Sequence, residues 1–584
     1  MNKKLPPFTL LLLTLTLLLA GCGAGSQPKG RRPSADWSRG LPVGSDLRGA
    51  VTIAVEPDGE PVHLTWPEAG ADDAVAIHYE QLDRNATTVL ERNLDLPGGN
   101  IHSPRLLLNR DGGITLFWAA RPDGADGWQV WGTTLDARGE PTRTSQALTP
   151  AEMNVRGYAV AQESEDLQYL IWEDTRTAAL YGLPLAAGQP TGPPVELAAG
   201  EGPALAVDEA GTLHLVWRRG GALYYTRYRP GTLSVTSGMQ VAELDIAFGD
   251  TLDGPVMSIS DGRAYVLWSI FSQSGLEAGT GRTEYIVFPV ATPQQVEPQR
   301  VRIMPPEEQP YESYAGAFPL TQLVPPPPSP TMNTDYVGDP AVTSGPGAGA
   351  AAVVSANQAW RQQTVVQLAL VLFGEGQLHG YQMAAKTQNV SQGATVATDA
   401  TGNLYLAWGE GAGGLNAYFA TTAPEMKDVI NRLDPADVAN LVLTSAMESV
   451  VGLLFMPLAV IWMLPGGLLT ALWRMRNQQE DAASVPSRII FAIGIVLYQG
   501  LKILFMPAIL SYVPFSAWLD IPTAWQEPLT LIVPLAVFLF ALLVGEIVRR
   551  RREETSTPIY FFIVAGIDGA LTLIVYGVNF LGVF

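Results

Sequence analysis

Repeated hydrophobic segments that end in tryptophan constrain the fold of this chain more than any other feature of its sequence. They recur at spacings of 52, 54, 45, 51 and 140 residues, and the long interval holds a weaker copy that ends in Phe373. Apolar and polar residues alternate within the segments, which predicts half-buried β-strands rather than the 3.6-residue period of helices. We expect the closing residues to pack in the core, namely Trp66, Trp118, Trp172, Trp217, Trp268, Phe373 and Trp408.

Strand repeats of about 50 residues are typical of a β-propeller, in which each sheet packs on the next and the ring leaves no open edge. We predict a propeller over residues 46–427, with a proline-rich insertion at 304–340. Seven copies favour a seven-bladed propeller. A six-bladed ring is the alternative, because Phe373 and Trp408 are only 35 residues apart.

The repeat resembles the sialidase-like, or BNR-type, β-propellers of exported bacterial proteins, over residues 46–425 and at the level of repeat style. The Asp-box of that group, Ser-x-Asp-x-Gly-x-Thr-Trp, is not matched, since residues 111–115 only echo it. The arginine motif that begins the sialidase arginine cluster is absent from the sequence. The resemblance therefore implies a fold and assigns no catalytic residue to this chain.

Several polar residues of the repeat have structural explanations. Asp208 and Asp399 each stand three residues before a glycine and nine before a tryptophan, which predicts a tight turn. His63 and His214 share one repeat position, so we interpret them as strand residues rather than metal ligands. No metal-binding, nucleotide-binding or nucleophile motif is found, and we expect no metal and no cofactor. We interpret one acidic cluster as solvated surface: Glu163, Glu165, Asp166, Glu173 and Asp174.

The N-terminal residues form an export signal. Lys3 and Lys4 precede an apolar run at 10–19, which is too short for an ordinary membrane span. Leu-Ala-Gly-Cys then follows and ends at Cys22, the only cysteine of the chain, so no disulfide can form within it. These four residues resemble the bacterial lipobox. The resemblance implies that 1–21 is a lipoprotein signal peptide, that Cys22 is lipidated, and that 22–45 is a flexible tether.

After residue 440 the chain is dominated by apolar stretches. Each reaches or exceeds the roughly 20 residues that cross a bilayer as a helix. We predict a four-helix transmembrane domain at 450–584, with spans at about 450–473, 489–513, 529–548 and 559–584.

Charges in the connecting loops predict the orientation of these spans. The first connection carries three arginines and the third carries four, whereas the middle one has no Lys or Arg and contains Asp520 and Glu527. By the positive-inside rule the first and third loops are cytoplasmic. This places both termini and the propeller outside a bacterial cytoplasmic membrane, in agreement with lipidation of Cys22.

Two local predictions concern the membrane domain. Residues 428–449 are expected to form a linker and an interfacial helix that Asp434 caps, because Pro435 follows it directly. Lys502 and Asp568 lie at comparable depths in the second and fourth spans. A lone charge in lipid is costly, so we expect these two residues to form an intramembrane charge pair. The pair would fix the packing of the two helices or, alternatively, serve as a proton or ion relay.

The charge balance limits the ligands of the outer domain. Residues before 441 contain 28 Lys and Arg against 47 Asp and Glu. An acidic surface repels phosphates, which argues against nucleic acid as a partner. We expect a membrane-anchored binding or scaffolding protein whose propeller recognises a protein or glycan, held by acyl chains on Cys22 and by its spans. A sialidase-like glycan hydrolase and a sensor or transport-complex subunit with a membrane partner are the alternatives.

Overall fold

The computed structural model describes residues 34–576 with interruptions. The predicted signal peptide and Cys22 lie outside the described residues. The chain divides into two compact units, one of residues 27–360 and 364–432 and the other of the remainder. The interruptions are 70–74, 99, 110–112, 123, 165–166, 230, 275–277, 305–310, 330–331, 346–348, 361–362, 386, 388, 412–413, 436, 440–442, 444–449, 451, 478–481, 506–522 and 552–554.

The first unit is an all-β, propeller-like assembly of antiparallel sheets that follow one another along the chain. One eight-stranded sheet joins the two ends of the unit, in the order β29-β30-β31-β1-β3-β4-β5, with β2 paired to β3. Its strands are β1 (Leu41–Leu47), β2 (Thr52–Val55), β3 (Val62–Ala69), β4 (Val75–Leu82), β5 (Thr88–Leu94), β29 (Val390–Thr398), β30 (Leu404–Gly411) and β31 (Leu415–Thr421).

Smaller sheets complete the assembly. The second sheet contains β6 (Asn100–Leu108), β7 (Ile114–Arg121), β8 (Gln129–Leu135) and β9 (Gln146–Ala147). The third contains β10 (Val155–Gln162), β11 (Leu167–Asp174), β12 (Ala179–Ala186), β13 (Gln189–Pro190) and β14 (Val195–Ala199). The fourth contains β15 (Glu201–Val207), β16 (Leu213–Arg219), β17 (Ala222–Tyr228) and β18 (Met239–Glu243). The others are β19 (Asp250–Ser260), β20 (Arg263–Ser272), β21 (Gly281–Pro289) and β22 (Gln299–Arg300); β25 (Val337–Ser344), β26 (Ala350–Trp360), β27 (Gln363–Gly374) and β28 (Gln377–Met383); and the short pair β23 (Glu312–Ser313) and β24 (Gln322–Leu323).

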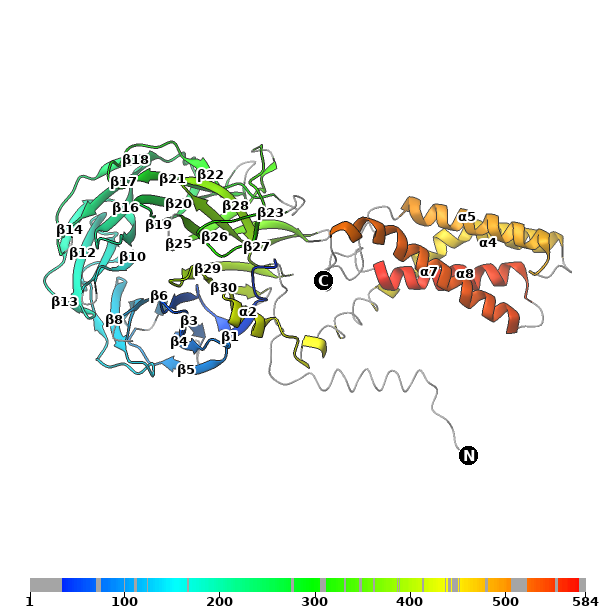
Figure 1. Ribbon diagram of the computed structural model, residues 1–584, viewed down its shortest axis with the longest axis horizontal. Helices are drawn as coiled ribbons and strands as arrows, with labels where there is room; N and C mark the ends of the chain where they lie inside the picture. Colours follow the sequence, from blue (N-terminus) through cyan, green and yellow to red (C-terminus); the bar gives the residue numbers. More distant parts are fainter. Residues whose placement is uncertain are drawn as a thin grey trace, which may run out of the picture. The chain divides into compact units, whose positions relative to one another are not determined.

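The sheets are arranged around a ring. The first strands contact one another in the cyclic order β2, β6, β10, β15, β19, β25, β29 and back to β2. Figure 1 shows several of these strands towards the middle, with β5, β13, β14 and β18 at the periphery. The first strand of the unit, β1, pairs with its last strand, β31, with Leu41 opposite Phe419, so the two ends of the unit close the ring together.

Tryptophans of the repeat pack between successive sheets. Trp66, Trp118, Trp172, Trp217, Trp268 and Trp408 are at most 1% exposed. Each lies on the strand that pairs with an inner strand of the ring, namely β3 with β2, β7 with β6, β11 with β10, β16 with β15, β20 with β19 and β30 with β29. Their burial excludes stacking of these rings on an external ligand.

The weak repeat copy differs from its prediction. Phe373 is buried, but it lies on β27, the third strand of its sheet. The pairing of Ala341 with Val353 matches the pairing of Val256 with Leu267, so Val354 occupies the position of Trp268. The repeat was recognised by an apolar segment that ends in an aromatic residue, and Val354 is not aromatic. The apolar segment that ends in Phe373, on the next strand, was therefore mistaken for the repeat.

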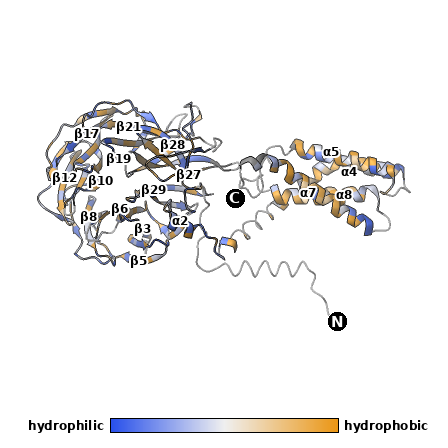
Figure 2. Ribbon diagram, in the orientation of Figure 1, coloured by the Kyte–Doolittle hydropathy of each residue, from blue (hydrophilic) through white to orange (hydrophobic). Residues whose placement is uncertain are grey.

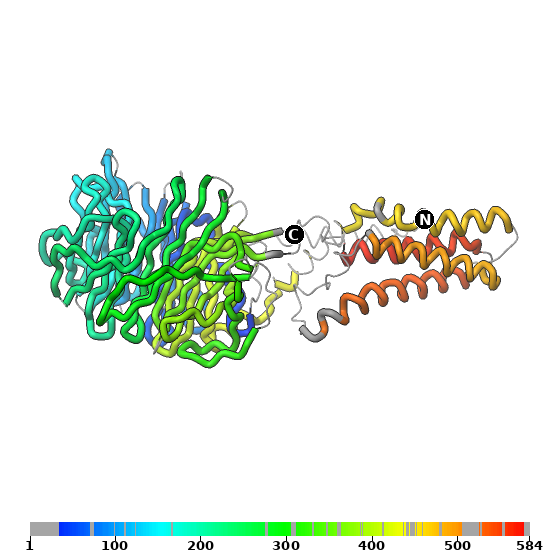
Figure 3. Tube along the Cα trace, turned by 90° about the horizontal axis from the view of Figure 1, so that it is seen from above, coloured from blue at the N-terminus to red at the C-terminus, as the bar shows by residue number. Residues whose placement is uncertain are grey.

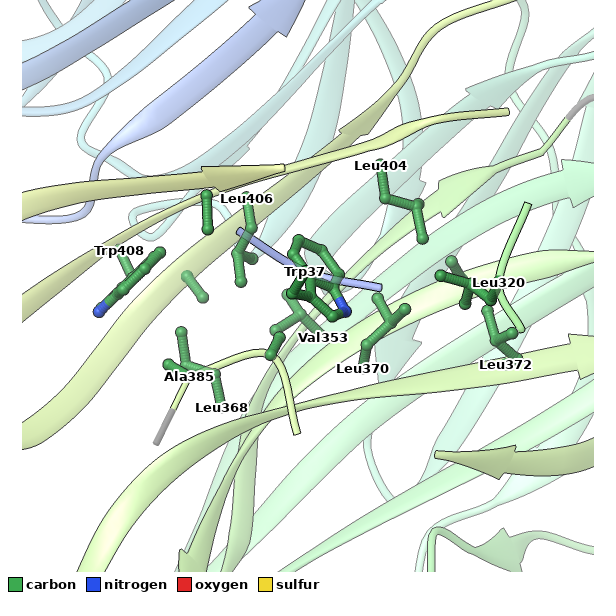
Figure 4. Close-up of a cluster of buried hydrophobic side chains, with 14 of the residues drawn as sticks. Trp37, Leu320, Val353, Leu368, Leu370, Leu372, Ala385, Leu404, Leu406 and Trp408 are labelled. Atoms are coloured by element: carbon green, nitrogen blue, oxygen red, sulfur yellow. The ribbon is translucent and has the colours of Figure 1, made fainter. Parts of the chain in front are cut away.

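The predicted flexible tether at 22–45 is wrong for its last part. Trp37 is completely buried in a cluster that includes Leu368, Leu370 and Trp408, as Figure 4 shows. Strand β1 begins at Leu41. The prediction failed because the segment is short and polar apart from this tryptophan, which inserts between two sheets.

The insertion is also shorter than predicted. Strand β25 begins at Val337, so Pro340 belongs to the repeat rather than to the insertion at 304–340. The described part of the insertion packs on the propeller-like unit through Phe318, Leu320 and Leu323, which are each at most 4% exposed.

The predicted turns are confirmed. Oδ1 of Asp208 and of Asp399 accepts hydrogen bonds from the backbone N–H groups two and four residues later, at 2.8–3.0 Å. Gly211 and Gly402 adopt φ angles of +76° and +88°, which favour glycine.

The second unit is helical. Its long helices contact one another in the pairs α4–α5, α4–α8, α5–α8 and α7–α8, and Figures 1 and 3 show them running side by side. Figure 2 shows that hydrophobic residues predominate along these helices. Helices with described bounds are α2 (Pro424–Ile430) in the first unit, and α4 (Met456–Arg476), α5 (Val485–Phe505), α7 (Thr523–Arg551) and α8 (Thr557–Tyr576) in the second.

Three of these segments are long and apolar enough to cross a membrane among the residues that the structure describes: Val485–Leu504, Pro528–Arg551 and Thr557–Tyr576. Helix α4 covers most of the first predicted span. The predicted cap at Asp434 is present, since its Oδ1 accepts a hydrogen bond from the N–H of Asp437, and Asp437 Oδ2 accepts one from the N–H of Asp434. This reciprocal pair is a capping box.

Candidate functional site

Backbone bulges interrupt the inner edge of the sheets at corresponding places. In each case the register between the first and second strands shifts near the beginning of the first strand, for example between Glu201 and Ala204 and between Asp253 and Val256. Matching shifts occur in the sheets that begin with β6, β10, β25 and β29. We call the equivalent residues the bulge belt: 49–51, 102–104, 156–158, 201–203, 253–255, 338–340 and 392–394.

Neighbouring parts of the bulge belt, together with Thr52 and Thr395 beside it, contact each other across the sheet boundaries from 392–394 through 49–51, 102–104 and 156–158 to 201–203. The contacts are Thr52 Oγ1 donating to Pro104 O at 2.7 Å, Tyr158 Oη donating to Ser103 O, Arg156 Nη1 donating to Glu201 Oε2 at 3.2 Å, and Thr395 Oγ1 donating to Val51 O at 2.8 Å.

The belt holds unusual backbone conformations. Gly202, Gly254 and Gly393 have φ between +61° and +95°, as glycine readily does. Ser103 and Asp339 adopt φ of +52° and +50° at the same position without being glycine. Non-glycine residues in this region cost roughly 1–3 kcal/mol and are concentrated at functional sites. The belt is therefore a candidate site on backbone grounds alone.

One sector of the belt carries balanced charges. Arg156 lies 3.2 Å from Glu201 and 3.6 Å from Glu173, and Arg218 lies 2.8 Å from Glu201. Glu173 also accepts a hydrogen bond from the N–H of Gly202 at 3.0 Å, and burial raises its pKa. Two arginines and two glutamates thus neutralise each other here and fix the position of exposed Arg156.

The next sector carries acids without a balancing cation. Burial by the surrounding protein raises the pKa of Asp253, and the charge of Asp339 raises it further. Burial also raises the pKa of Asp339. Neither forms an ion pair with a Lys or Arg among the described residues. The Asp253 side chain is nevertheless exposed to solvent, and that of Asp339 is partly exposed.

Partly exposed aromatic rings flank both sectors. His102 packs edge-on against Trp128, with ring centroids 4.3 Å apart, and the Arg121 guanidinium lies 5.8 Å from the Trp128 centroid. Phe271 stacks on Tyr336 at 5.7 Å, next to Asp339. Aromatic faces offer a ligand apolar contact, while the neighbouring carboxylates accept hydrogen bonds and the arginine donates them.

A separate polar cluster lies inside the helical unit. Lys502 Nζ of α5 lies 2.7 Å from Asp568 Oδ2 of α8 and 3.2 Å from Thr572 Oγ1. The Tyr498 hydroxyl donates to the same carboxylate oxygen at 2.7 Å, and Gln499 donates to it at 3.3 Å. Lys502 and Asp568 are 2% and 0% exposed. The structure thus brings the two charges together between the two helices for which the pair is predicted.

The predicted strand histidines pack as structural residues. Nδ1 of His63 lies 2.8 Å from the Tyr79 hydroxyl, and Nδ1 of His214 lies 2.7 Å from the Tyr225 hydroxyl. For the acidic cluster interpreted as solvated surface, Glu165 and Asp166 lie outside the described residues and Glu163 is partly exposed, but the other two residues contradict the interpretation. Glu173 is buried, and so is Asp174, at 5% and 1% exposure, because both bind backbone N–H groups across the bulge.

The bulge belt was not found from the sequence, although a signal for it exists. Proline stands 14 residues before Trp118 and Trp217, as Pro104 and Pro203, and each follows a residue with positive φ. Pro340 stands in the same relation to Val354. Each proline and the residue before it thus recur at a fixed distance from the repeat position. Only the strand pairing, however, shows that these residues lie on the inner strands.

No protein-family model and no curated protein sequence matches the chain. Solved structures similar to it include an α-L-arabinanase of Penicillium chrysogenum in complex with arabinobiose (12% identity, TM-score 0.37, covering 65% of this chain and 97% of that one). A mutant NanB sialidase of Streptococcus pneumoniae has 9% identity and a TM-score of 0.35 over 67% of this chain and 71% of its own. A polysaccharide lyase of family PL25, an ulvan lyase, has 9% identity and a TM-score of 0.41 over 67% and 93%. Similarity at this level assigns neither a family nor an activity.

Proposed function

We propose that this protein is a membrane-anchored extracytoplasmic binding or scaffolding protein whose propeller recognises a protein or glycan at the bulge belt. The observation that supports this most is the arrangement of the belt. Corresponding positions on adjacent inner strands present Arg156, Glu201 and Asp253, all open to solvent. A rigid ring of sheets that presents charged and aromatic groups together provides the fixed polar contacts that binding sites use.

The anchoring is part of the proposal. Seven blades are supported by the cyclic order of the inner strands, with β29, β30, β31 and β1 as one blade and β2 to β5 as the next. Four spans are supported by the packing of α4 with α5 and α8, in addition to the three apolar segments. Lipidation of Cys22 and an outside location of both termini rest on the lipobox resemblance and the arginine-rich loops.

Ligand capture by the full-length protein tests this function. Protein solubilised gently from native membranes is analysed for bound partners by mass spectrometry, and the same protein is applied to a glycan array. The double variant Asp253→Asn/Asp339→Asn should lose most of the retained ligand. Glu209→Gln, an exposed residue of the β15–β16 turn, should keep it. Equal retention by both variants would place the ligand elsewhere.

Glycan hydrolysis is the second candidate, and the pair Asp253 and Asp339 favours it. Neighbouring carboxyl groups with raised pKa values are the arrangement in which one acid stays protonated and acts as a general acid. Incubation of the intact protein with extracellular polysaccharides should then release reducing ends. Asp339→Asn should lower the rate by at least about a hundred-fold. Absence of released ends from every polysaccharide tested would leave binding as the function.

A further inference from the structure

The N-terminal segment of the propeller-like unit is built into the ring. The Asp36 carboxylate accepts hydrogen bonds from the N–H and hydroxyl of Thr321, at 2.9 and 2.7 Å, and from the Gln382 side chain. Trp37 fills the space between the sheet of β25–β28 and the sheet of β30. Ser38 pairs with Thr421, its N–H donating to the carbonyl at 2.9 Å and its hydroxyl accepting from the N–H at 3.0 Å.

The same segment also holds α2, the helix through which the chain leaves the ring. The Arg39 N–H donates to Asn431 Oδ1 at 2.9 Å, and its guanidinium donates to the carbonyls of Ile430 and Arg432 at 3.4 and 3.0 Å. These acceptors lie at the C-terminal end of α2, where carbonyl groups lack helical partners and favour a cation. Met426 and Ile430 bury the other side of the helix, each at 2% exposure.

We propose that residues 35–39 act as a clamp that fixes the exit helix α2 to the ring, so that both connections to the membrane leave the propeller at one edge. The clamp leads directly into β1, which pairs with β31 and closes the ring. A mechanical force on either connection is therefore transmitted directly between residues 35–39 and 424–432, across the sheet that contains the first and last strands of the unit. The force does not have to pass around the other blades.

The function of the clamp rests on the proposed membrane anchoring. The clamp gives the lipid on Cys22 and the membrane spans distinct roles. At most 13 residues, 23–35, separate Cys22 from Asp36, and an extended chain of that length spans roughly 45 Å. With Cys22 lipidated, the clamp is tethered within that distance of the lipid. The spans then retain the protein, and the lipid limits how far its clamped edge moves from the bilayer.

Hydrogen exchange followed by mass spectrometry, on the full-length protein in lipid nanodiscs, tests the clamp. Arg39→Ala removes the two guanidinium contacts to the carbonyls of Ile430 and Arg432 and leaves the Trp37 cluster closed, so peptides that cover 424–432 should exchange at least about ten-fold faster than in the wild type. Arg219→Ala is the matched control, since Arg219 is exposed and its guanidinium packs on Tyr224 in the sheet of β15–β18, which contains no residue of the clamp. Its peptides over 424–432 should be unchanged.

Two further arms separate the clamp from the lipid. Arg39→Ala in a Cys22→Ser background should show the same acceleration, because the clamp does not depend on lipid. The mass of the N-terminal peptide reports lipidation independently. Unchanged exchange of 424–432 in Arg39→Ala would overturn the clamp, whatever the state of Cys22, and acceleration in the Arg219→Ala control would overturn it as well.

Discussion

Glu80 shows how a single buried acid makes the stability of the propeller depend on pH. It is 2% exposed on β4, and burial raises the pKa of its carboxyl to about 7, despite a hydrogen bond from Thr88. A raised pKa in the folded state means that the stabilising contribution is complete below the unfolded pKa and is lost as the pH rises through the folded pKa. The unfolding free energy should therefore fall between about pH 5 and about pH 8 because of this residue.

Substitution Glu80→Gln removes the titrating group and keeps the shape of the side chain. At about pH 8 the variant should be more stable than the wild type by about 1–3 kcal/mol, and at about pH 5 the two should be similar. Thermal unfolding across this pH range measures the difference. A constant difference at all pH values would show that Glu80 is ionised throughout.

Lys502 and Asp568 provide the corresponding test in the helical unit. Reversal of one charge leaves two like charges buried side by side, so each of Lys502→Asp and Asp568→Lys should destabilise the helical unit by at least about 3–5 kcal/mol, the typical cost of removing one partner of a buried pair. The charge-swapped double variant restores the pair and should recover part of this loss. Thermal stability in detergent gives the comparison. A swap no more stable than either single variant would show that the two residues do not stabilise each other.

At the scale of elements, close contacts between glycine and the core tryptophans determine how the ring closes. A Cβ added to Gly44 of β1 would lie 2.3 Å from Trp66 Cζ2. Gly44→Ala should therefore destabilise the protein by about 1–3 kcal/mol through overpacking. Gly192→Ala meets no atom within 4 Å and is the matched control, expected to change stability by less than about 0.5 kcal/mol. Chemical denaturation measures the unfolding free energy of both variants. Equal values would contradict close packing of β1 against Trp66.

Elements with a strong local pattern were the ones that the sequence predicted well. The alternation before each tryptophan indicated its strand, and Asp208 and Asp399 indicated their turns, because turn and strand chemistry act over a few residues. Val354 and Trp37 were missed, since their environments are created by strands that are distant in sequence. The bulge belt was missed for the same reason: Asp253 and Asp339 come together only through the ring, 86 residues apart along the chain.

At the scale of the whole molecule, the orientation in the membrane is the first prediction. Asp520→Cys, in the loop between the second and third predicted spans, should react with a membrane-impermeant maleimide in intact cells. Asp481→Cys, in the first loop, should react only after the membrane is permeabilised, because arginine-rich loops stay in the cytoplasm. Labelling of Asp481→Cys in intact cells would reverse the proposed topology.

Recognition of a ligand at the bulge belt is the central claim, and site-specific photocrosslinking in living cells tests it most directly. A benzophenone amino acid replaces exposed Gln392 of the belt, and in a parallel strain it replaces exposed Ala210, in the turn at the opposite end of β15. The account predicts a discrete crosslinked product from position 392 and none from position 210. Products from position 210 alone, or equal products from both positions, would contradict it.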